Sequence, residues 1–421
     1  MDQFLNNEFF DWIKKVAETI ENYEGDKITV VHHNDADGLT SGAILSNFCE
    51  CIDKKSDLVC IEKVHPAIVE KIHEGKEGEI IFYTDLAGLA AEMIDKIDAG
   101  RNSVVIIDHH PAKAIESENV IVFDSEIAGI SGDLFTSAST LNYIISTTIS
   151  KEMRKFAYLA VIGAVGDYHD RSGGVLGLDR YAVEEAVHLG QLKIKIEDVK
   201  ERYYIKFFNE FADVIAKRLT NLGAIGYENK GYKKGIKACL EGFDEEIVKE
   251  AERLENLKKE KFSRALDKLS EGDLHQEKYC QWFNLGDFFS PMGVKAVGEF
   301  LQMTKDMRIF SESKYIIGFQ NMPDRIPDLG KINLNASKMS GRVPVPMERK
   351  IFRGEAPGLD YLVPAASEKI GAFADATHRI AAATTLQKGR EEEFIRAFEK
   401  LVDDFYRKKL DKQVKPPQTL F

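Results

Sequence analysis

A histidine and two aspartates follow a predicted buried strand near the start of the chain, in an order that suits metal binding. The apolar run that ends at Val31 leads into His33, Asp35 and Asp37, and Gly38 closes the segment. Alternate residues of an extended segment point the same way, so these side chains can converge. Imidazole nitrogen and carboxylate oxygen together suit Mn²⁺, Mg²⁺ or Zn²⁺. The alternative is an acidic, solvated turn, because Asp and Gly are ordinary turn residues.

Acidic residues or histidines also follow two further apolar strands and one apolar helix. The strands are predicted at 80–84 and 104–107, and the helix at 156–165. In an open α/β sheet, ligands bind outside the carboxyl ends of the strands. Four independent elements with such residues at their ends favour a dinuclear metal site over turn chemistry. The residues that follow these three elements are Asp85, Asp108, His109, His110 and Asp167.

The elements that must position these residues alternate between strand and helix. Strands predicted near 58–63, 79–84, 103–108 and 119–123 are separated by helices near 66–74 and 88–98, and an amphipathic helix is predicted over 4–21. This β-α-β rhythm predicts a parallel sheet. The glycine fingerprint of dinucleotide-binding folds is absent from the sequence, so no dinucleotide is expected.

The length of 421 residues predicts two or three domains. From about 178 to 272 the sequence is charged, has helical periodicity and lacks strand-like runs, whereas the strand pattern returns from about 276. We therefore predict an α/β protein with two lobes. An N-terminal parallel-sheet domain (1–177) carries the metal site, a helical connector spans 178–275, and a smaller C-terminal α/β domain (276–421) follows.

The ordered set of motifs resembles the DHH phosphoesterase superfamily, which includes RecJ-type exonucleases, short-oligonucleotide ribonucleases and manganese pyrophosphatases. His33 lies two residues before Asp35, which follows the RecJ-like pattern and not that of the pyrophosphatases. The segment 376–383 resembles part of the DHH-associated C-terminal domain, and His378 matches the histidine of its motif. The glycines that flank this motif in the family are replaced here by Ala376, Thr377 and Ala383.

The resemblance implies two Mn²⁺ ions per subunit, with Mg²⁺ as an alternative. It implies that Asp85 bridges the ions, that Asp108 orients a ligand histidine, and that His110 contacts the scissile phosphate. Asp85 would hold the first ion with His33 and Asp35. The ligands of the second ion would be Asp37, Asp85, His109 and Asp167.

The expected activity is exonucleolytic hydrolysis of single-stranded DNA or RNA in DNA repair or replication. The whole chain resembles the archaeal RecJ-like group and, within it, the Hef-associated nuclease branch, for which 3′→5′ polarity and a DNA-repair helicase or nuclease as partner are expected. One alternative is a phosphoesterase that acts on oligonucleotides of two to five residues or on phosphoadenosine phosphate. Another is a non-catalytic replisome scaffold, although such relatives tend to lose metal ligands and every ligand position is filled here.

The C-terminal domain contains the residues expected to bind the nucleic acid. Between positions 331 and 354 there are six cations and one anion, in a chain whose net charge is −12. Such a cluster fits contacts with a phosphate backbone, and a solvated basic hairpin is the alternative. For His378 the alternative is a structural histidine at the start of a helix. The residues assigned to substrate binding are His378, Arg379, Lys338 and Arg342.

Three further expectations concern a helix start, the compartment and the assembly. The helix that begins near Thr136 and Ser137 offers an N-terminus where a phosphate could bind, but N-capping by these side chains is favoured. No apolar run approaches a membrane span, and the five cysteines form no metal or disulfide pattern, so a cytoplasmic protein is expected. The two prolines and the apolar end of segment 416–421 suggest docking on a neighbouring subunit, in a homo-oligomer of two or three chains. The alternatives are a docking peptide for a partner, similar to those that bind sliding clamps, and a disordered tail.

Overall fold

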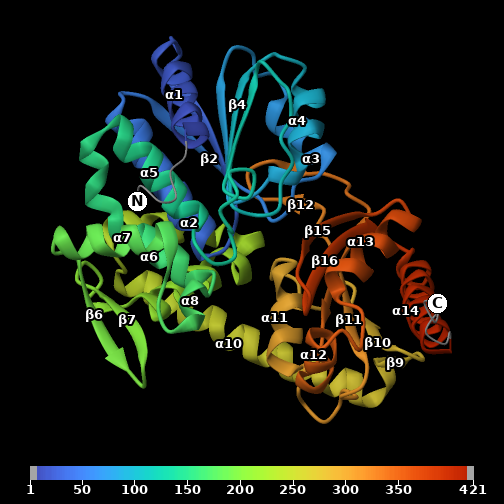
Figure 1. The fold of residues 1–421 in the computed structure, drawn as a ribbon. Helices are drawn as coiled ribbons and strands as arrows, with labels where there is room; N and C mark the ends of the chain where they lie inside the picture. The colour runs from blue at the N-terminus through green and yellow to red at the C-terminus, as the bar shows by residue number, and fades with distance from the viewer. Residues whose placement is uncertain (1–6, 415–421) are drawn as a thin grey trace, which may run out of the picture. The chain divides into compact units, whose positions relative to one another are not determined.

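The computed structural model describes residues 7–414, which form two compact units (Figure 1). Unit 1 comprises the described residues up to 256 together with 325–332. Unit 2 comprises 257–324 and the described residues from 333 onward. The long helix α10 (Glu245–Lys268) runs through the first boundary. The expected tail segment 416–421 lies outside the described residues.

Unit 1 is built on the expected parallel sheet of five strands, in the order β2-β1-β3-β4-β5. Apart from the edge strand 55–60, the strands are almost entirely buried, as expected for a parallel sheet that is covered on both faces. Because all the strands run the same way, their carboxyl ends lie along one edge. The strands are β1 (Lys27–His32), β2 (Lys55–Cys60), β3 (Ile80–Thr84), β4 (Ser103–Asp108) and β5 (Val120–Asp124).

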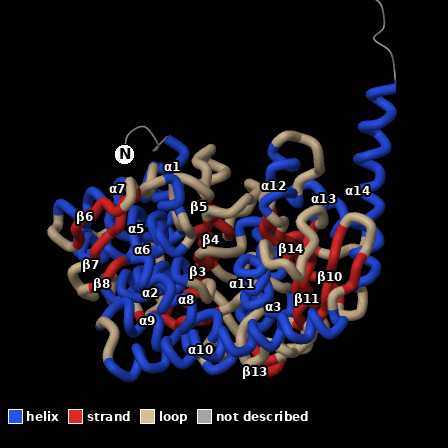
Figure 2. Tube along the Cα trace, turned by 90° about the horizontal axis from the view of Figure 1, so that it is seen from below, coloured by secondary structure: helices blue, strands red, loops and turns tan. Residues whose placement is uncertain are grey.

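Helices cover both faces of this sheet (Figures 1 and 2). The helix α1 (Asn7–Glu21) packs on β5, where the ring of Phe9 meets that of Phe123 edge to face at 4.7 Å. Its apolar residues at helical spacing are buried, which confirms the amphipathic prediction. The helices α3 (Pro66–His73) and α4 (Ala91–Asp98) pack together. A cluster of mutually packed helices consists of α2 (Ala36–Cys51), α5 (Ala138–Ile149), α6 (Ala157–Gly166), α7 (Gly177–His188), α8 (Ala212–Thr220) and α9 (Gly231–Glu241).

The prediction that 178–275 is entirely helical is wrong. This segment contains an antiparallel sheet made of β6 (Leu192–Glu197), β7 (Lys200–Ile205) and β8 (Glu210–Phe211). The β6–β7 turn consists of Asp198 and Val199, both with positive φ (49° and 66°). This is the geometry of a tight hairpin, but the turn lacks the glycine by which such hairpins are recognised in sequences.

Unit 2 contains a six-stranded mixed sheet in the order β15-β16-β14-β11-β10-β9. Its core is apolar and includes residues of α13 (Leu359–Lys369) and α14 (Glu391–Val414). On another face, α11 (Lys295–Thr304) packs against β11 and β14, and α12 (Val345–Phe352) follows β14 in the chain. The strands are β9 (His275–Gln276), β10 (Cys280–Asn284), β11 (Tyr315–Asn321), β14 (Ala336–Arg342), β15 (Phe373–Thr377) and β16 (Ala381–Gln387).

Two local predictions in unit 2 differ from the structure. The sequence pattern predicts a strand at 332–336, but residues 332–335 form the connection between β13 (Gly330–Lys331) and β14. The segment around His378 is the turn between β15 and β16, so the helix start considered for this histidine is wrong. Across residues 7–414, no helix is long and apolar enough to cross a membrane.

Candidate metal centre

Three neighbouring strands of the parallel sheet end at the same level, and each is followed by a candidate metal ligand. The order β1-β3-β4 is continuous, and the register pairs His32 with Thr84 and Thr84 with Ile107. The next residues along the chain, His33 and Asp85, therefore emerge side by side, next to Asp108 at the end of β4. This is the arrangement that the sequence predicted for the carboxyl edge of the sheet.

His33, Asp35 and Asp85 form the first group of metal-capable atoms, which lie within 4.8 Å of one another. The Nδ1 atom of His33 lies 3.1 Å from Oδ2 of Asp35 and 3.3 Å from Oδ2 of Asp85. The other carboxylate oxygen of Asp35 accepts a hydrogen bond from the backbone N–H of Gly38, as the N-cap of α2. The cap fixes the orientation of Asp35, so one oxygen remains directed at the histidine.

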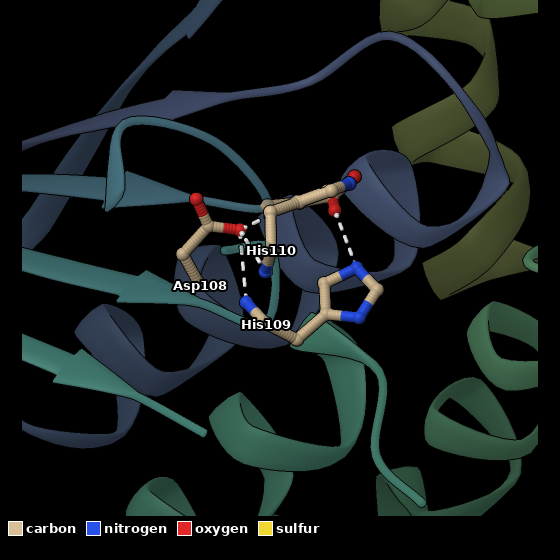
Figure 3. Close-up of side chains that lie close together, drawn as sticks. Asp108, His109 and His110 are labelled. Atoms are coloured by element: carbon tan, nitrogen blue, oxygen red, sulfur yellow. Dashed lines mark hydrogen bonds and ion pairs between the residues drawn. The ribbon is translucent and has the colours of Figure 1, made fainter. Parts of the chain in front are cut away.

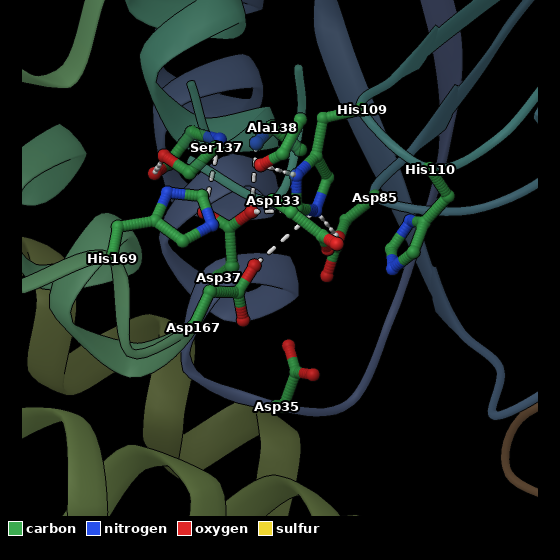
Figure 4. A network of polar contacts seen from close by, with 12 residues as sticks. Asp35, Asp37, Asp85, His109, His110, Asp133, Ser137, Ala138, Asp167 and His169 are labelled. Atoms are coloured by element: carbon green, nitrogen blue, oxygen red, sulfur yellow. Dashed lines mark hydrogen bonds and ion pairs between the residues drawn. The ribbon is translucent and has the colours of Figure 1, made fainter. Parts of the chain in front are cut away.

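The second group, Asp37, Asp85, His109 and Asp167, also lies within 4.8 Å (Figure 4). The Nε2 atom of His109 is 3.2 Å from Oδ2 of Asp167, 3.4 Å from Oδ1 of Asp85 and 3.8 Å from Oδ2 of Asp37. Asp85 thus offers one oxygen to each group. This is the position expected of a carboxylate that bridges two ions. Its backbone has a φ of 63°, a conformation that non-glycine residues seldom adopt and that is concentrated at functional sites.

Asp37 is held by the N-terminus of α5. Its two oxygens accept hydrogen bonds from the backbone N–H groups of Ala138 (2.8 Å) and Ser139 (3.0 Å). The side chain of Ser137 caps the same helix by accepting a hydrogen bond from the N–H of Thr140. Capping, the favoured interpretation of this helix start, is confirmed. The N–H groups considered for a phosphate are occupied by a carboxylate of the protein itself.

The loop between β1 and α2 is supported by residues from the segment that the sequence assigned to a connector. The backbone N–H of Ala36 donates a hydrogen bond to Oγ1 of Thr220 (3.2 Å). Gly223 follows in a π-helical turn, and a Cβ atom there would lie 2.0 Å from the carbonyl oxygen of Asn34. The connector region therefore helps to position the metal-binding loop, a role that its charged, helical sequence did not indicate.

Asp108 orients the third residue of the D-H-H run (Figure 3). Its Oδ1 accepts hydrogen bonds from Nδ1 of His110 (2.8 Å) and from the backbone N–H of His109 (2.9 Å). The ring of His109 is held instead by the carbonyl oxygen of Gly132, which accepts a hydrogen bond from Nδ1 (3.1 Å). The orienting role expected for Asp108 is therefore directed at the ring of His110, and not at that of the ligand candidate. The side chain of His110 is 39% exposed, whereas that of His109 is 5% exposed.

The electrostatics of the site call for cations. Burial and the nearby charges of Asp85 and Asp167 raise the pKa of Asp37 well above its ordinary value, and burial together with Asp35 raises the pKa of Asp85. Burial alone would lower the pKa of His109, but Asp167 and Asp85 raise it well above its ordinary value. Several carboxylates thus share one buried space with too little positive charge.

The donor set fits a pair of divalent ions. Nε2 of His109 and Oδ2 of Asp85 are buried. Neighbouring donor atoms lie 3.2–3.4 Å away, but none of these approaches within the described chain has the geometry of a hydrogen bond. Buried polar atoms without a partner are costly, and atoms of this kind within an N/O donor cluster mark a place for a cation. Oxygen donors with a minority of imidazole nitrogens suit Mn²⁺ and Mg²⁺.

Two residues near the site were missed from the sequence. His169 shares a group of metal-capable atoms with His109 and Asp167, and it follows Asp167 by only two positions. Asp124 ends β5, pairs in register with Asp108, and is buried. A signal existed for both, because Asp124 also follows an apolar strand and the histidine lies within the same turn as a predicted ligand.

The substrate residues predicted in the C-terminal domain all lie in unit 2. The register pairs Arg342 of β14 with Ala381 of β16, and so places the arginine beside the turn that carries His378 and Arg379. Lys338, on the same strand, is buried. The wider basic cluster does not lie within one unit, because Lys331 belongs to unit 1, and Arg353 pairs with Glu355 at 2.8 Å.

The half-buried guanidinium of Arg342 has no acidic partner among the residues whose side chains the structure describes. Its Nε donates a hydrogen bond to the side-chain oxygen of Gln302 (3.2 Å), and its Nη1 to the carbonyl oxygen of Gly341 (2.8 Å). Burial lowers the pKa of Arg342 to about 10. A cation in this environment is stabilised by any anion that reaches it.

Residues 27–164 match the family model described as DHH family, N-terminal domain. An uncharacterized protein of Methanocaldococcus jannaschii is 29% identical over 231 residues, which cover 52% of this chain and 50% of that protein. The chain therefore spans about half the length of this curated relative.

Two solved structures show the same fold over most of the chain. RecJ from Thermus thermophilus, crystallised with Mn²⁺, superposes with a TM-score of 0.61 at 15% identity, over 93% of this chain and 55% of RecJ. CDC45 from Entamoeba histolytica superposes with a TM-score of 0.55 at 11% identity, over 94% of this chain and 98% of CDC45. At these identities the likeness shows the fold alone.

Proposed function

We propose that this chain, whose residues 27–164 match the DHH family model and whose fold resembles that of RecJ, is a Mn²⁺-dependent exonuclease of single-stranded DNA or RNA. The observation that carries the proposal is the pair of donor groups that share Asp85. The 3′→5′ polarity, a role in repair or replication, and a DNA-repair helicase or nuclease as partner rest on the sequence resemblance. The homo-oligomer remains a prediction.

The chain's own residues account for how such a site would work. His33, Asp35 and Asp85 would hold one ion, and Asp37, Asp85, His109 and Asp167 the other. Divalent ions held by these residues would supply a water of lowered pKa as nucleophile and would neutralise charge on the non-bridging phosphate oxygens. Asp108 fixes the ring of His110 through Nδ1, so Nε2 of this more exposed histidine is available to a scissile phosphate. The hydrogen bonds from α5 hold Asp37 in place before a ligand arrives.

Arg342 is the strongest candidate for a contact with the strand away from the metal centre, because its guanidinium lacks a carboxylate partner in the described part of the chain. His378 and Arg379 lie in the neighbouring turn. A phosphate bound to Arg342 would position a strand and carry no base specificity. Arg342→Gln should therefore weaken the cleavage of long strands about tenfold or more, through KM, and leave dinucleotide turnover within about twofold. An equal loss on both substrates would contradict this role.

The test of the proposal is a set of single strands of DNA and of RNA, labelled at either the 5′ or the 3′ end and incubated with the metal-loaded protein. A 3′→5′ exonuclease releases mononucleotides from 3′-labelled strands at once and shortens 5′-labelled strands stepwise. Asp85→Asn should remove at least about 10³-fold of the activity, because both donor groups lose their shared carboxylate. Asp57→Asn, at an exposed ion pair with Lys27, is the matched control and should cleave like the natural chain.

The same assay separates the alternatives. A phosphoesterase of very short substrates would hydrolyse dinucleotides or phosphoadenosine phosphate and leave long strands intact. A scaffold without catalytic activity would cleave none of these substrates, even though it bound Mn²⁺. The intact donor set favours an enzyme over a scaffold.

A further inference from the structure

His169 lies beside the second donor group because the chain reverses direction directly after Asp167. Tyr168 adopts a left-handed conformation with a φ of 61°, and His169 begins the 3-10 turn His169–Ser172. A tyrosine in this conformation is uncommon and carries strain. The reversal places Asp167 and His169 on the same side of the turn, and the side chain of His169 is only 2% exposed.

A buried carboxylate fixes which nitrogen of His169 carries the proton. Nδ1 lies 2.7 Å from Oδ2 of Asp179. The other oxygen of Asp179 accepts hydrogen bonds from the backbone N–H of Ser137 (2.9 Å) and from the hydroxyl of Thr140 (2.6 Å). Because Asp179 acts throughout as an acceptor, Nδ1 of His169 must be the donor. In the neutral ring, Nε2 then carries the lone pair.

This lone pair belongs to the nitrogen that is free to face the metal centre. The ligand atoms of His169, His109 and Asp167 lie within 4.8 Å of one another, and the two imidazole rings meet edge to face at 5.9 Å (Figure 4). His109 has the same construction, since its Nδ1 donates to the carbonyl oxygen of Gly132 and its Nε2 points into the carboxylates. A histidine with one nitrogen bonded to an oxygen acceptor and the other directed at an acidic cluster is how metal-binding histidines are built.

We propose that His169 is a further ligand of the ion held by Asp37, Asp85, His109 and Asp167, with Asp179 as the residue that fixes its tautomer. The inference rests on the metal centre of the proposed function and extends it. With five donors, an octahedral ion keeps about one position for water or substrate. The second imidazole favours ions that accept nitrogen, such as Mn²⁺ and Co²⁺, over Mg²⁺.

Metal binding to the full chain tests the proposal without any reference to activity. The protein is stripped of metal with EDTA and titrated by calorimetry with Mn²⁺ and, separately, with Mg²⁺. In His169→Gln, one of the two Mn²⁺ sites should weaken by about 10–100-fold, and Mg²⁺ binding should change less. His188→Gln, at the exposed end of α7, is the matched control and should bind as the natural chain does. Unchanged Mn²⁺ affinity in His169→Gln would overturn the assignment, even if strand cleavage were impaired.

A second variant guards against misfolding. In His169→Gly, added imidazole should restore the weakened Mn²⁺ site, and thermal unfolding should show a folded chain. Failure of imidazole to restore binding in a folded variant also counts against a ligand role. If the natural chain binds two Mn²⁺ ions and His169→Gln binds only one tightly, the assignment of His169 as a ligand is supported even where no nuclease activity is found. If strands are cleaved and His169→Gln binds normally, the proposed function survives and this inference fails.

Discussion

Asp124 is one of the buried carboxyl groups whose protonation should make stability depend on pH at the carboxyl edge of the parallel sheet. Burial, and then the charge of Asp108, raise the pKa of Asp124 from 3.8 to about 8. Its Oδ2 is buried and makes no hydrogen bond with any described residue. The folded chain therefore retains a proton that the unfolded chain loses above about pH 4.

In metal-free protein this group should make the free energy of unfolding fall as pH rises from about 4 to 8, by on the order of 1.4 kcal/mol per pH unit, and then level off. Asp124→Asn removes this titrating group, so the free energy of unfolding of the variant should vary less between pH 4 and 8. Relative to the natural chain, the variant should therefore become more stable as the pH approaches 8. Urea unfolding at pH 5, 6.5 and 8 in EDTA measures the difference. Asp57→Asn at the exposed edge of β2 serves as control, and an unchanged slope in Asp124→Asn would contradict the prediction.

At the same scale, the sequence predicted the ligand candidates because each directly follows a run of apolar residues. His33, Asp85 and His109 lie after buried strands, and a parallel sheet brings such ends together. Tautomers and partners could not be predicted, since they depend on distant residues. Asp179 meets His169, and the carbonyl oxygen of Gly132 meets His109, only in the folded chain.

Helix α6 must approach the metal centre closely, and a glycine permits this approach. A Cβ atom at Gly163 would lie 2.0 Å from Oγ of Ser139 and 2.3 Å from Oδ1 of Asp37. Alanine is otherwise favoured over glycine inside a helix by about 1 kcal/mol. Here the clash with a side chain held by two backbone hydrogen bonds outweighs that gain.

Gly163→Ala should therefore displace Asp37, weaken Mn²⁺ binding about tenfold or more, and lower stability by about 1–3 kcal/mol. Calorimetric titration and urea unfolding measure the two effects. Gly235→Ala in α9 is the matched control for metal binding, because the nearest atom to its Cβ is a terminal methyl carbon of Leu39, at 2.7 Å, and not a metal ligand candidate. Normal metal affinity in Gly163→Ala would show that Asp37 can move without loss.

The predictable elements were those with apolar periodicity, and the missed ones depend on turn geometry. The five parallel strands and helices α1, α3 and α4 follow the hydrophobic pattern. The β6–β7 hairpin was not predicted because Val199, a β-branched residue, adopts a left-handed conformation at its tip. The turn at His378 was not predicted because a run of alanines favours a helix, whereas pairing with β14 makes 381–387 a strand.

At the scale of the whole molecule, residues 325–332 are set apart from the segments that flank them. They belong to unit 1, although β11 before them and β14 after them belong to unit 2. Asp328 accepts bonds from Lys230 (2.6 Å), Lys233 (3.1 Å) and the hydroxyl of Tyr232. The ring of Tyr232 in turn packs edge to face on His32, at 5.5 Å, next to a metal ligand candidate.

Asp328→Ala should lower the free energy of unfolding by about 1–3 kcal/mol, because it leaves the largely buried tyrosine hydroxyl without its acceptor. Urea unfolding of the full chain, with tryptophan fluorescence and circular dichroism as independent probes, measures this loss. Asp324→Ala is the control, since Asp324 is exposed and forms no ion pair within the described residues. Equal midpoints for both variants would mean that the Asp328 contacts contribute nothing to stability.

The interruption of unit 1 by residues 257–324 has a consequence for how the protein is made. The first part of unit 1 is complete when the ribosome has added residue 256. Residues 257–332 must then be added before the second part of unit 1, 325–332, has been synthesised. At roughly 5–20 residues per second this delay lasts about 4–15 s. During that interval the nascent chain already contains every metal ligand candidate, yet Tyr232 still awaits the carboxylate of Asp328. The metal ligand candidates are therefore synthesised first, and the contact of Tyr232 with Asp328 can form only afterwards.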